Sequence, residues 1–171
     1  MEDKLLEALK LGYEAEKEGL RMYLKLSRKS NVLSGKNMFI QLAADEVDHL
    51  ELIEKFIEKH MAGKKYEHIE VPRSRLSKIL PNIKDLSLQP VEKAFLTDEE
   101  ALKIALSHEL KAKDFYAQEQ QKTKVPEVKK LFSDLSKVEE KHYQIIQAEL
   151  DFIHKDGFWF DAMEFSLEKE V

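Results

Sequence analysis

Apolar residues recur every three or four positions along most of the chain, and polar residues fill the positions between them. Four stretches show this helical period: residues 3–29, 36–62, 98–123 and 126–155. Gly63 and Gly157 follow the second and fourth stretches, where glycine commonly ends a helix, and Pro126 can occupy the first turn of the fourth. The pattern therefore predicts four long helices, as in a four-helix bundle.

The segment between the second and third predicted helices, residues 63–97, loses the helical period. It contains three of the four prolines, and its only helical signal is a short one at 73–80. A bundle can use such a long connection to carry the chain from one end to the other. Thr97 and Glu100 match a capping box that would start the third helix. We therefore predict an all-α domain over residues 1–157, made of two helix hairpins joined by a crossover.

The two hairpins repeat each other in sequence. The repeated polar pairs are Glu16 and Glu109, Tyr23 and Tyr116, Glu46 and Glu139, and His49 and His142. The members of each pair are 93 positions apart (109 − 16 = 93 for the first). Apolar residues of the helical stripes repeat at the same offset, so these polar residues lie on faces that should be buried. An internal duplication with polar residues in its core indicates a functional site.

Four carboxylates in one apolar core would be unstable unless cations neutralised them. Two histidines cannot balance four negative charges, whereas two divalent cations can. Glu and His three positions apart lie on one helix face, so each Glu-x-x-His can offer an oxygen and a nitrogen to one centre. Carboxylate and imidazole without thiolate suit iron or manganese better than copper or a structural zinc. We predict a dinuclear metal site whose ligands are Glu16, Glu46, His49, Glu109, Glu139 and His142.

At these residues the chain resembles the rubrerythrin-like branch of the ferritin-like superfamily. Stretches 16–23 and 109–116 are similar to that family's Glu … Tyr motif, and stretches 42–49 and 135–142 to its Leu-Ala-x-x-Glu-x-x-His motif. The resemblance implies a ferritin-like bundle with two bound metal ions, iron being favoured and manganese or zinc the alternatives. It implies that Glu46 and Glu139 bridge the metals, that Glu16 and His49 complete one and Glu109 and His142 the other, and that Tyr23 and Tyr116 orient carboxylates.

The chain departs from this family in three ways. It has no cysteine, so these residues include no rubredoxin module, and electrons must come from another protein or from ferrous iron. Ala112 stands where some rubrerythrins carry an extra glutamate, and its repeat mate is Gly19; this small pair leaves room for dioxygen or peroxide, or allows close helix packing. The crossover is longer than is usual in the family. His108, next to Glu109, points about 100° away around the helix, and we predict that it is not a ligand.

These features predict a non-haem di-iron oxidoreductase that reduces peroxide or dioxygen, or oxidises Fe(II). Two alternatives stay open from the sequence. One is a metal-binding or iron-handling bundle without turnover, and the other is a metal-free structural or interaction module.

Composition narrows the choice of partners. The net charge of −5 argues against a nucleic-acid binder, and no apolar run approaches the roughly 20 residues of a membrane span. The first residues do not resemble a signal peptide, and we expect a cytoplasmic protein. The tail, residues 158–171, starts with Phe158, Trp159 and Phe160, which we expect to pack on the bundle or on a second subunit, with docking to a redox partner as the alternative. A homo-oligomer, in the form of a dimer, is the expected assembly.

Overall fold

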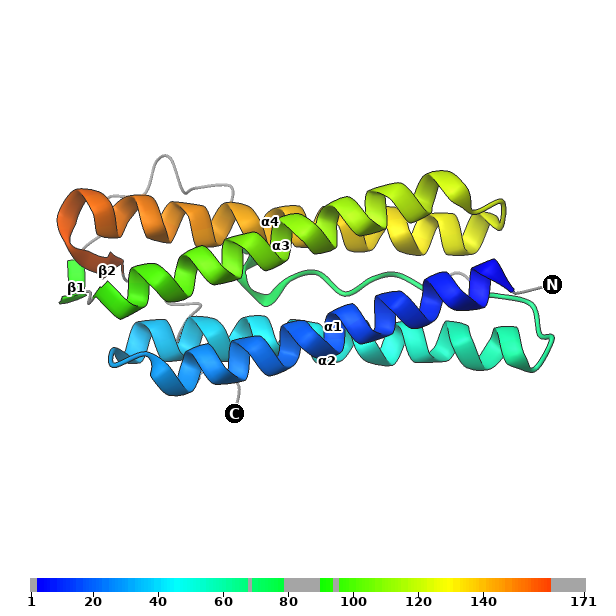
Figure 1. The fold of residues 1–171 in the computed structure, drawn as a ribbon, viewed down its shortest axis with the longest axis horizontal. Helices are drawn as coiled ribbons and strands as arrows, with labels where there is room; N and C mark the ends of the chain where they lie inside the picture. Colours follow the sequence, from blue (N-terminus) through cyan, green and yellow to red (C-terminus); the bar gives the residue numbers. More distant parts are fainter. Residues whose placement is uncertain (1–2, 68, 79–89, 94–95, 161–171) are drawn as a thin grey trace.

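Four helices dominate the computed structural model, which describes residues 3–67, 69–78, 90–93 and 96–160. They are α1 (Lys4–Lys29), α2 (Leu33–Met61), α3 (Leu96–Lys122) and α4 (Pro126–Asp156). α1 packs along α2 and α3 packs along α4, so the chain forms two hairpins, as Figure 1 shows. The predicted all-α bundle of two hairpins is therefore confirmed.

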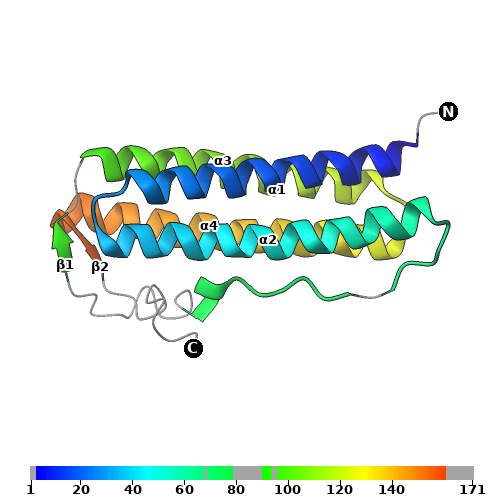
Figure 2. The same ribbon diagram turned by 90° about the horizontal axis from the view of Figure 1, so that it is seen from below.

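The two hairpins lie against each other so that the helices form two layers. α1 and α3 lie side by side in one layer, and α2 and α4 lie in the other (Figure 2). Neighbouring helices run in opposite directions (Figure 1), which requires the chain to return along the bundle between α2 and α3. Residues 64–67 and 69–78 run back along the outer side of the α2–α4 layer (Figure 2).

The helix ends follow from local chemistry. Asp3 caps α1, because its carboxylate accepts hydrogen bonds from the backbone N–H groups of Leu5 and Leu6, both at 3.2 Å. Pro126 is the first residue of α4. Gly157 ends that helix with a φ of 72°, a left-handed conformation that glycine adopts without steric cost.

Two predicted helix starts were wrong by a few residues. α2 begins at Leu33 rather than at residue 36, so Gly35 lies inside the helix. A Cβ at Gly35 would lie 2.6 Å from the Ser30 hydroxyl and 2.7 Å from the Trp159 ring, so this glycine serves close packing rather than a turn. α3 begins at Leu96, which places Thr97 inside the helix rather than at its cap.

A small antiparallel ribbon joins the crossover to the end of α4. Strand β1 (Pro90–Lys93) pairs with β2 (Phe158–Phe160), in a register that is irregular between Pro90 and Glu92. This pairing was not predicted from the sequence. Trp159 is fully buried and meets the Phe39 ring edge-on, with ring centroids 6.3 Å apart, so this part of the aromatic tail packs on the bundle. The remainder of the tail, residues 161–171, lies outside the described residues.

The described part of the crossover also contains a short 3-10 helix, η1 (Arg75–Lys78), where a short helix was predicted at 73–80. It contacts both α2 and α4. Leu76 is fully buried and joins the apolar cluster at one end of the bundle, so η1 is docked on the helices rather than free of them.

The bundle has two apolar clusters with polar residues between them. One cluster includes Tyr23, Phe39 and Ile145, and the other includes Leu9 and Phe132. In each helix, the repeated glutamates and histidines fall between the residues of the two clusters. The repeated polar residues therefore lie in the middle of the bundle, between two apolar clusters.

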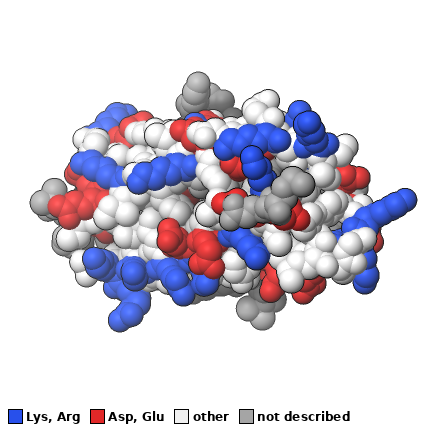
Figure 3. Space-filling model, turned by 45° about the vertical axis from the view of Figure 1, so that its right-hand side comes forward, with Lys and Arg blue, Asp and Glu red and all other residues white. Residues whose placement is uncertain are grey.

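The outer surface mixes charges of both signs. On the face seen in Figure 3, lysine and arginine side chains alternate with aspartate and glutamate, and neither sign forms a continuous field there. Within the residues that the structure describes, no helix has both the length and the apolar character needed to cross a bilayer.

Candidate metal centre

The six predicted metal ligands meet in the middle of the bundle. They come from all four helices, and each has an exposed fraction of 2% or less: Glu16, Glu46, His49, Glu109, Glu139 and His142. The amphipathic pattern explains the position, because each of these residues lies on the inward stripe of its helix. Burial of so many ionisable groups in one place is costly and needs a compensating partner.

These side chains form two overlapping groups, each able to surround one cation. In the first group, ligand atoms of Glu16, Glu46, His49 and Glu139 all lie within 4.8 Å of one another. The second group replaces Glu16 and His49 with Glu109 and His142 at the same spacing. Glu46 and Glu139 belong to both groups. The arrangement can hold two cations side by side, with these two carboxylates between them.

The Nδ1 atoms of both histidines face the carboxylates. His49 Nδ1 lies 3.0 Å from Glu16 Oε2 and 3.4 Å from oxygens of Glu46 and Glu139. His142 Nδ1 lies 3.1 Å from Glu139 Oε2 and 3.5 Å from Glu109 Oε2. The two imidazole rings are nearly parallel, at 23°, with centroids 6.0 Å apart. Each ring therefore presents one nitrogen to its own half of the centre.

The two tyrosines bond across the hairpins. The Tyr23 hydroxyl donates a hydrogen bond to Glu109 Oε1, and the Tyr116 hydroxyl donates one to Glu16 Oε1. Each tyrosine thus bonds the glutamate of the other hairpin, because α1 and α3 run in opposite directions and two turns along one helix reach the glutamate of its neighbour. Both hydroxyls are fully buried and fix the rotation of these two carboxylates.

Asp45 is a site residue that the sequence analysis missed. It is 2% exposed, and its Oδ2 lies 3.0 Å from His142 Nε2, on the side of the ring away from the cluster. Burial alone would raise the pKa of Asp45, but its bond to His142 holds that pKa below the usual value. The available signal was a break in the repeat, since the mate of Asp45 is Val138 (45 + 93 = 138).

Several carboxylate oxygens in the centre have no protein partner. Glu46 Oε1, Glu109 Oε2 and Glu139 Oε1 are buried and accept no hydrogen bond from the described part of the chain. Buried polar atoms are normally paired, because an unpaired one costs about 1–3 kcal/mol. All three belong to the two cation-sized groups, so divalent ions would satisfy them and balance the charge. The donor set therefore fits a pair of metal ions.

Without cations, protons must compensate the charge. Burial raises the pKa of Glu46 well above its usual value, with a further contribution from the charge of Glu16. Burial and the charge of Glu139 raise the pKa of Glu109 to about 8. Burial opposes charge on both imidazoles, but the surrounding carboxylates outweigh it and raise the pKa values of His49 and His142.

Glu139 behaves differently from the other bridging carboxylate. Burial alone would raise its pKa, but the hydrogen bond from His142 and the positive charge of the nearby His49 ring hold that pKa well below the usual value. The metal-free centre thus favours the ionised form of Glu139 and the charged forms of both imidazoles, and it favours the protonated forms of Glu46 and Glu109. Cations must displace these protons in order to bind.

Gly19 and His108 explain how tightly the centre is enclosed. A Cβ at Gly19 would lie 2.7 Å from His108 Nε2 and 3.3 Å from Glu46 Oε1. His108 is half-buried, meets the Tyr23 ring edge-on and belongs to neither cation group. His108 and Glu46 thus occupy the space that a side chain at Gly19 would need. Gly19 allows close packing here, which is one of the two roles expected for it.

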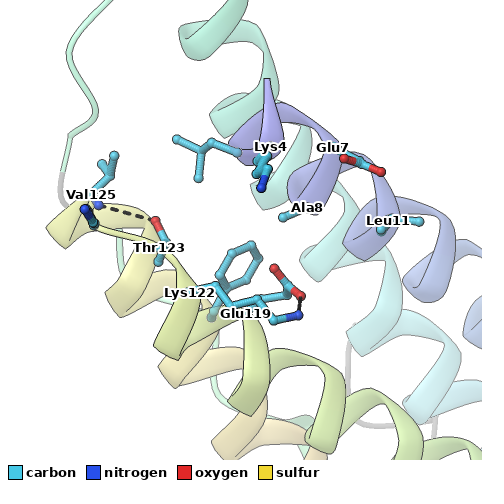
Figure 4. A pocket seen from close by; sticks show the side chains of 11 residues that line it. Lys4, Glu7, Ala8, Leu11, Glu119, Lys122, Thr123 and Val125 are labelled. Carbon is cyan, nitrogen blue, oxygen red and sulfur yellow. Dashed lines mark hydrogen bonds and ion pairs between the residues drawn. The ribbon is translucent and has the colours of Figure 1, made fainter. Parts of the chain in front are cut away.

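A surface cavity of about 440 Å³ lies away from this cluster. It is open between the start of α1 and the end of α3, as Figure 4 shows, with Lys4 and Glu7 on one side and Glu119 and Lys122 on the other. Lys122 Nζ donates a 2.6 Å hydrogen bond to Glu119 within it. None of its lining residues belongs to the Glu/His cluster, so the candidate chemistry lies in the closed core and not in this cavity.

Comparison with known proteins gives one family. A family model described as Rubrerythrin matches residues 7–150, which include every residue of the two cation groups. Neither curated proteins nor solved structures gave a match. Because the matched region covers well over half of the 171 residues, the chain belongs to the rubrerythrin family, whose members are ferritin-like di-iron proteins.

Proposed function

We propose that this protein is a non-haem di-iron oxidoreductase that acts on peroxide or dioxygen, or that oxidises Fe(II). The observation that carries the proposal is the pair of overlapping carboxylate–histidine groups with unpartnered oxygens in the core. Such a donor set, oxygen-rich and without thiolate, favours iron, with manganese or zinc as alternatives.

Each half of the centre would hold one ion. Glu16 and His49 would bind the first ion, and Glu109 and His142 the second, with the shared carboxylates between them. When bound, the iron pair supplies the redox chemistry: two electrons and two protons convert one hydrogen peroxide into two waters.

The chain's own residues prepare the centre for that chemistry. The crossed bonds from Tyr23 and Tyr116 hold the outer carboxylates in fixed orientations. Full burial excludes bulk water and strengthens each charge interaction in the centre. The protonated carboxyls and imidazoles of the metal-free centre release their protons as ions bind, so charge stays balanced in both states.

Electrons must come from outside these 171 residues. The chain contains no cysteine, so it has no rubredoxin-type iron site of its own. We propose an external electron-donor protein for peroxide reduction, or Fe(II) itself as the donor.

Anaerobic reconstitution with Fe(II), followed by stopped-flow mixing, tests the proposal. We expect two iron ions per chain, and faster loss of hydrogen peroxide or of Fe(II) than in protein-free solution. Glu46→Ala should abolish both metal binding and activity, whereas Glu51→Ala, an exposed glutamate on the same helix, should change neither. Metal content well below two per chain would contradict the di-metal centre. A loaded protein that accelerates neither reaction would contradict the enzyme and leave a metal-handling bundle.

A further inference from the structure

The crossover is bound to one ligand of the centre through a short hydrogen-bonded chain. In η1, the backbone N–H of Arg75 donates to both carboxylate oxygens of Asp45, at 3.2 and 3.1 Å. The Arg75 side chain adds a 2.7 Å bond to Asp45 Oδ1 and a 2.8 Å bond to Asp48 Oδ2. A bond from the Ser74 side chain also reaches Asp45. One segment of the crossover therefore fixes a buried carboxylate of α2.

Asp45 passes this constraint to the centre. Asp45 Oδ2 also lies 3.0 Å from His142 Nε2, while Nδ1 of the same ring faces the carboxylate cluster. A carboxylate on the outer nitrogen of a metal-binding histidine fixes both the tautomer and the ring orientation. Asp45 can do this for His142 only while its own position is held, and Arg75 holds it with one bond from its guanidinium and two from its backbone N–H.

Within the residues that the structure describes, the other half of the centre has no equivalent of this support. The repeat mate of Asp45 is Val138, a buried apolar residue that cannot accept a hydrogen bond from an imidazole. η1 is also the single 3-10 helix among the described residues, so no second one supports the other half there. The two halves are therefore similar in their ligands and different in what supports their histidines.

We propose that Arg75 is a positioning residue for the half of the metal centre that contains His142, and that docking of η1 and metal binding at that half stabilise each other. This inference rests on the proposed di-metal centre. It follows that loss of the Arg75 side chain weakens metal binding at the His142 half more than at the His49 half. Energetic coupling between two sites is reciprocal. Bound metal should therefore stabilise the docking of η1 by the same free energy by which docked η1 strengthens metal binding.

Stepwise metal binding tests the first part of the inference. Metal-free wild type, Arg75→Ala, Arg75→Lys and the control Arg73→Ala are titrated with Co(II), whose visible spectrum reports its ligands. Arg73 is exposed and two residues away. We expect Arg75→Ala to weaken one of two binding steps by about 10- to 100-fold, the range typical of lost support behind a metal ligand, and to leave the other within threefold. Arg75→Lys should restore part of the loss, and Arg73→Ala should match wild type.

Hydrogen exchange tests the second part. Amides of residues 74–76 in the wild-type protein should exchange more slowly once both metals are bound, and Arg75→Ala should lose that difference. This measurement on the wild type also keeps the inference testable if Arg75→Ala does not fold.

The outcomes separate the two proposals. Wild type that binds no metal would contradict the di-metal centre itself. Only the role of Arg75 would be overturned if wild type binds two ions and Arg75→Ala binds both as wild type does. The same holds if Arg75→Ala binds both ions with equally weakened affinity. If the amide exchange rates of residues 74–76 are the same with and without metal, the proposed coupling is overturned. A purely structural anchor would lower the thermal midpoint without separating the two binding steps.

Discussion

The metal-free protein should lose stability as the pH rises from about 5 to about 8. Burial and the charge of Glu139 raise the pKa of Glu109 from 4.5 to about 8 in the folded state. Between these values the folded protein keeps a proton that the unfolded chain has released. Its free energy of unfolding then falls by about 1.4 kcal/mol per pH unit for this one group. Across three pH units this amounts to about 4 kcal/mol, a large part of the roughly 5–15 kcal/mol typical of a domain.

Three other ionisable groups of the centre act in the same direction. A group whose pKa is raised by folding contributes its full stabilisation below its unfolded pKa and loses it as the pH rises through the folded pKa. This holds for Glu46, His49 and His142, whose pKa values are all raised. The pKa of Glu139 is lowered instead, so its contribution is lost only in acid, below this window.

Glu109→Gln isolates the contribution of Glu109 to this pH dependence. Glutamine keeps the shape and a carbonyl oxygen for the Tyr23 hydroxyl, but it has no proton to release. Urea unfolding of chelator-treated protein at pH 5, 6, 7 and 8 should show a shallower pH dependence for this variant. Relative to wild type, it should gain up to about 4 kcal/mol between pH 5 and 8. Glu100→Gln, an exposed change on the same helix, should run parallel to wild type.

Two results would refute this reasoning. One is a wild-type stability that stays constant or rises between pH 5 and 8 without metal. The other is a Glu109→Gln variant that runs parallel to wild type, which would mean that Glu109 is ionised in the folded, metal-free protein. Saturating metal should remove this loss of stability with rising pH in the wild type, because the ions replace the protons and the folded centre then has none to release.

Three further predictions follow from the packing and the ligand groups. Glu46→Ala should lose both metals and Glu16→Ala mainly one, as metal analysis after gel filtration would show; equal losses would contradict the bridging position of Glu46. Gly19→Ala should displace His108 and lower the thermal midpoint, because the alanine Cβ would lie 2.7 Å from the His108 imidazole. An unchanged midpoint would mean that the two helices move apart there without cost. Trp159→Ala should cost about 3–5 kcal/mol in urea unfolding, since the ring is fully buried, and a cost below about 1 kcal/mol would show that the ribbon does not stabilise the bundle.

Much of this structure could be predicted from periodicity. The spacing of apolar residues predicted the positions of the four helices. The offset of the internal repeat identified the polar residues that the structure brings together. The β1–β2 ribbon could not be predicted in this way. Its strands are three and four residues long and distant in sequence, so their pairing leaves no local pattern.

Two features of the centre depended on three-dimensional arrangement. Asp45 lies beside a predicted ligand and resembles a surface charge until the structure shows it against His142. The crossed bonds of Tyr23 and Tyr116 depend on which helices are neighbours and on their directions. Neither fact is contained in the spacing of residues along one helix.

The crossed tyrosine bonds have a consequence for how such a centre can originate. A single hairpin carries two glutamates, one histidine and a tyrosine whose acceptor belongs to the other hairpin, so it is half of a site. Two identical hairpins related by a two-fold axis would complete each other and form both cation groups. The internal repeat retains that approximate symmetry within one chain. Joining the halves covalently leaves each free to diverge, and the replacement of a carboxylate by an apolar residue at Asp45 and Val138 is one such difference.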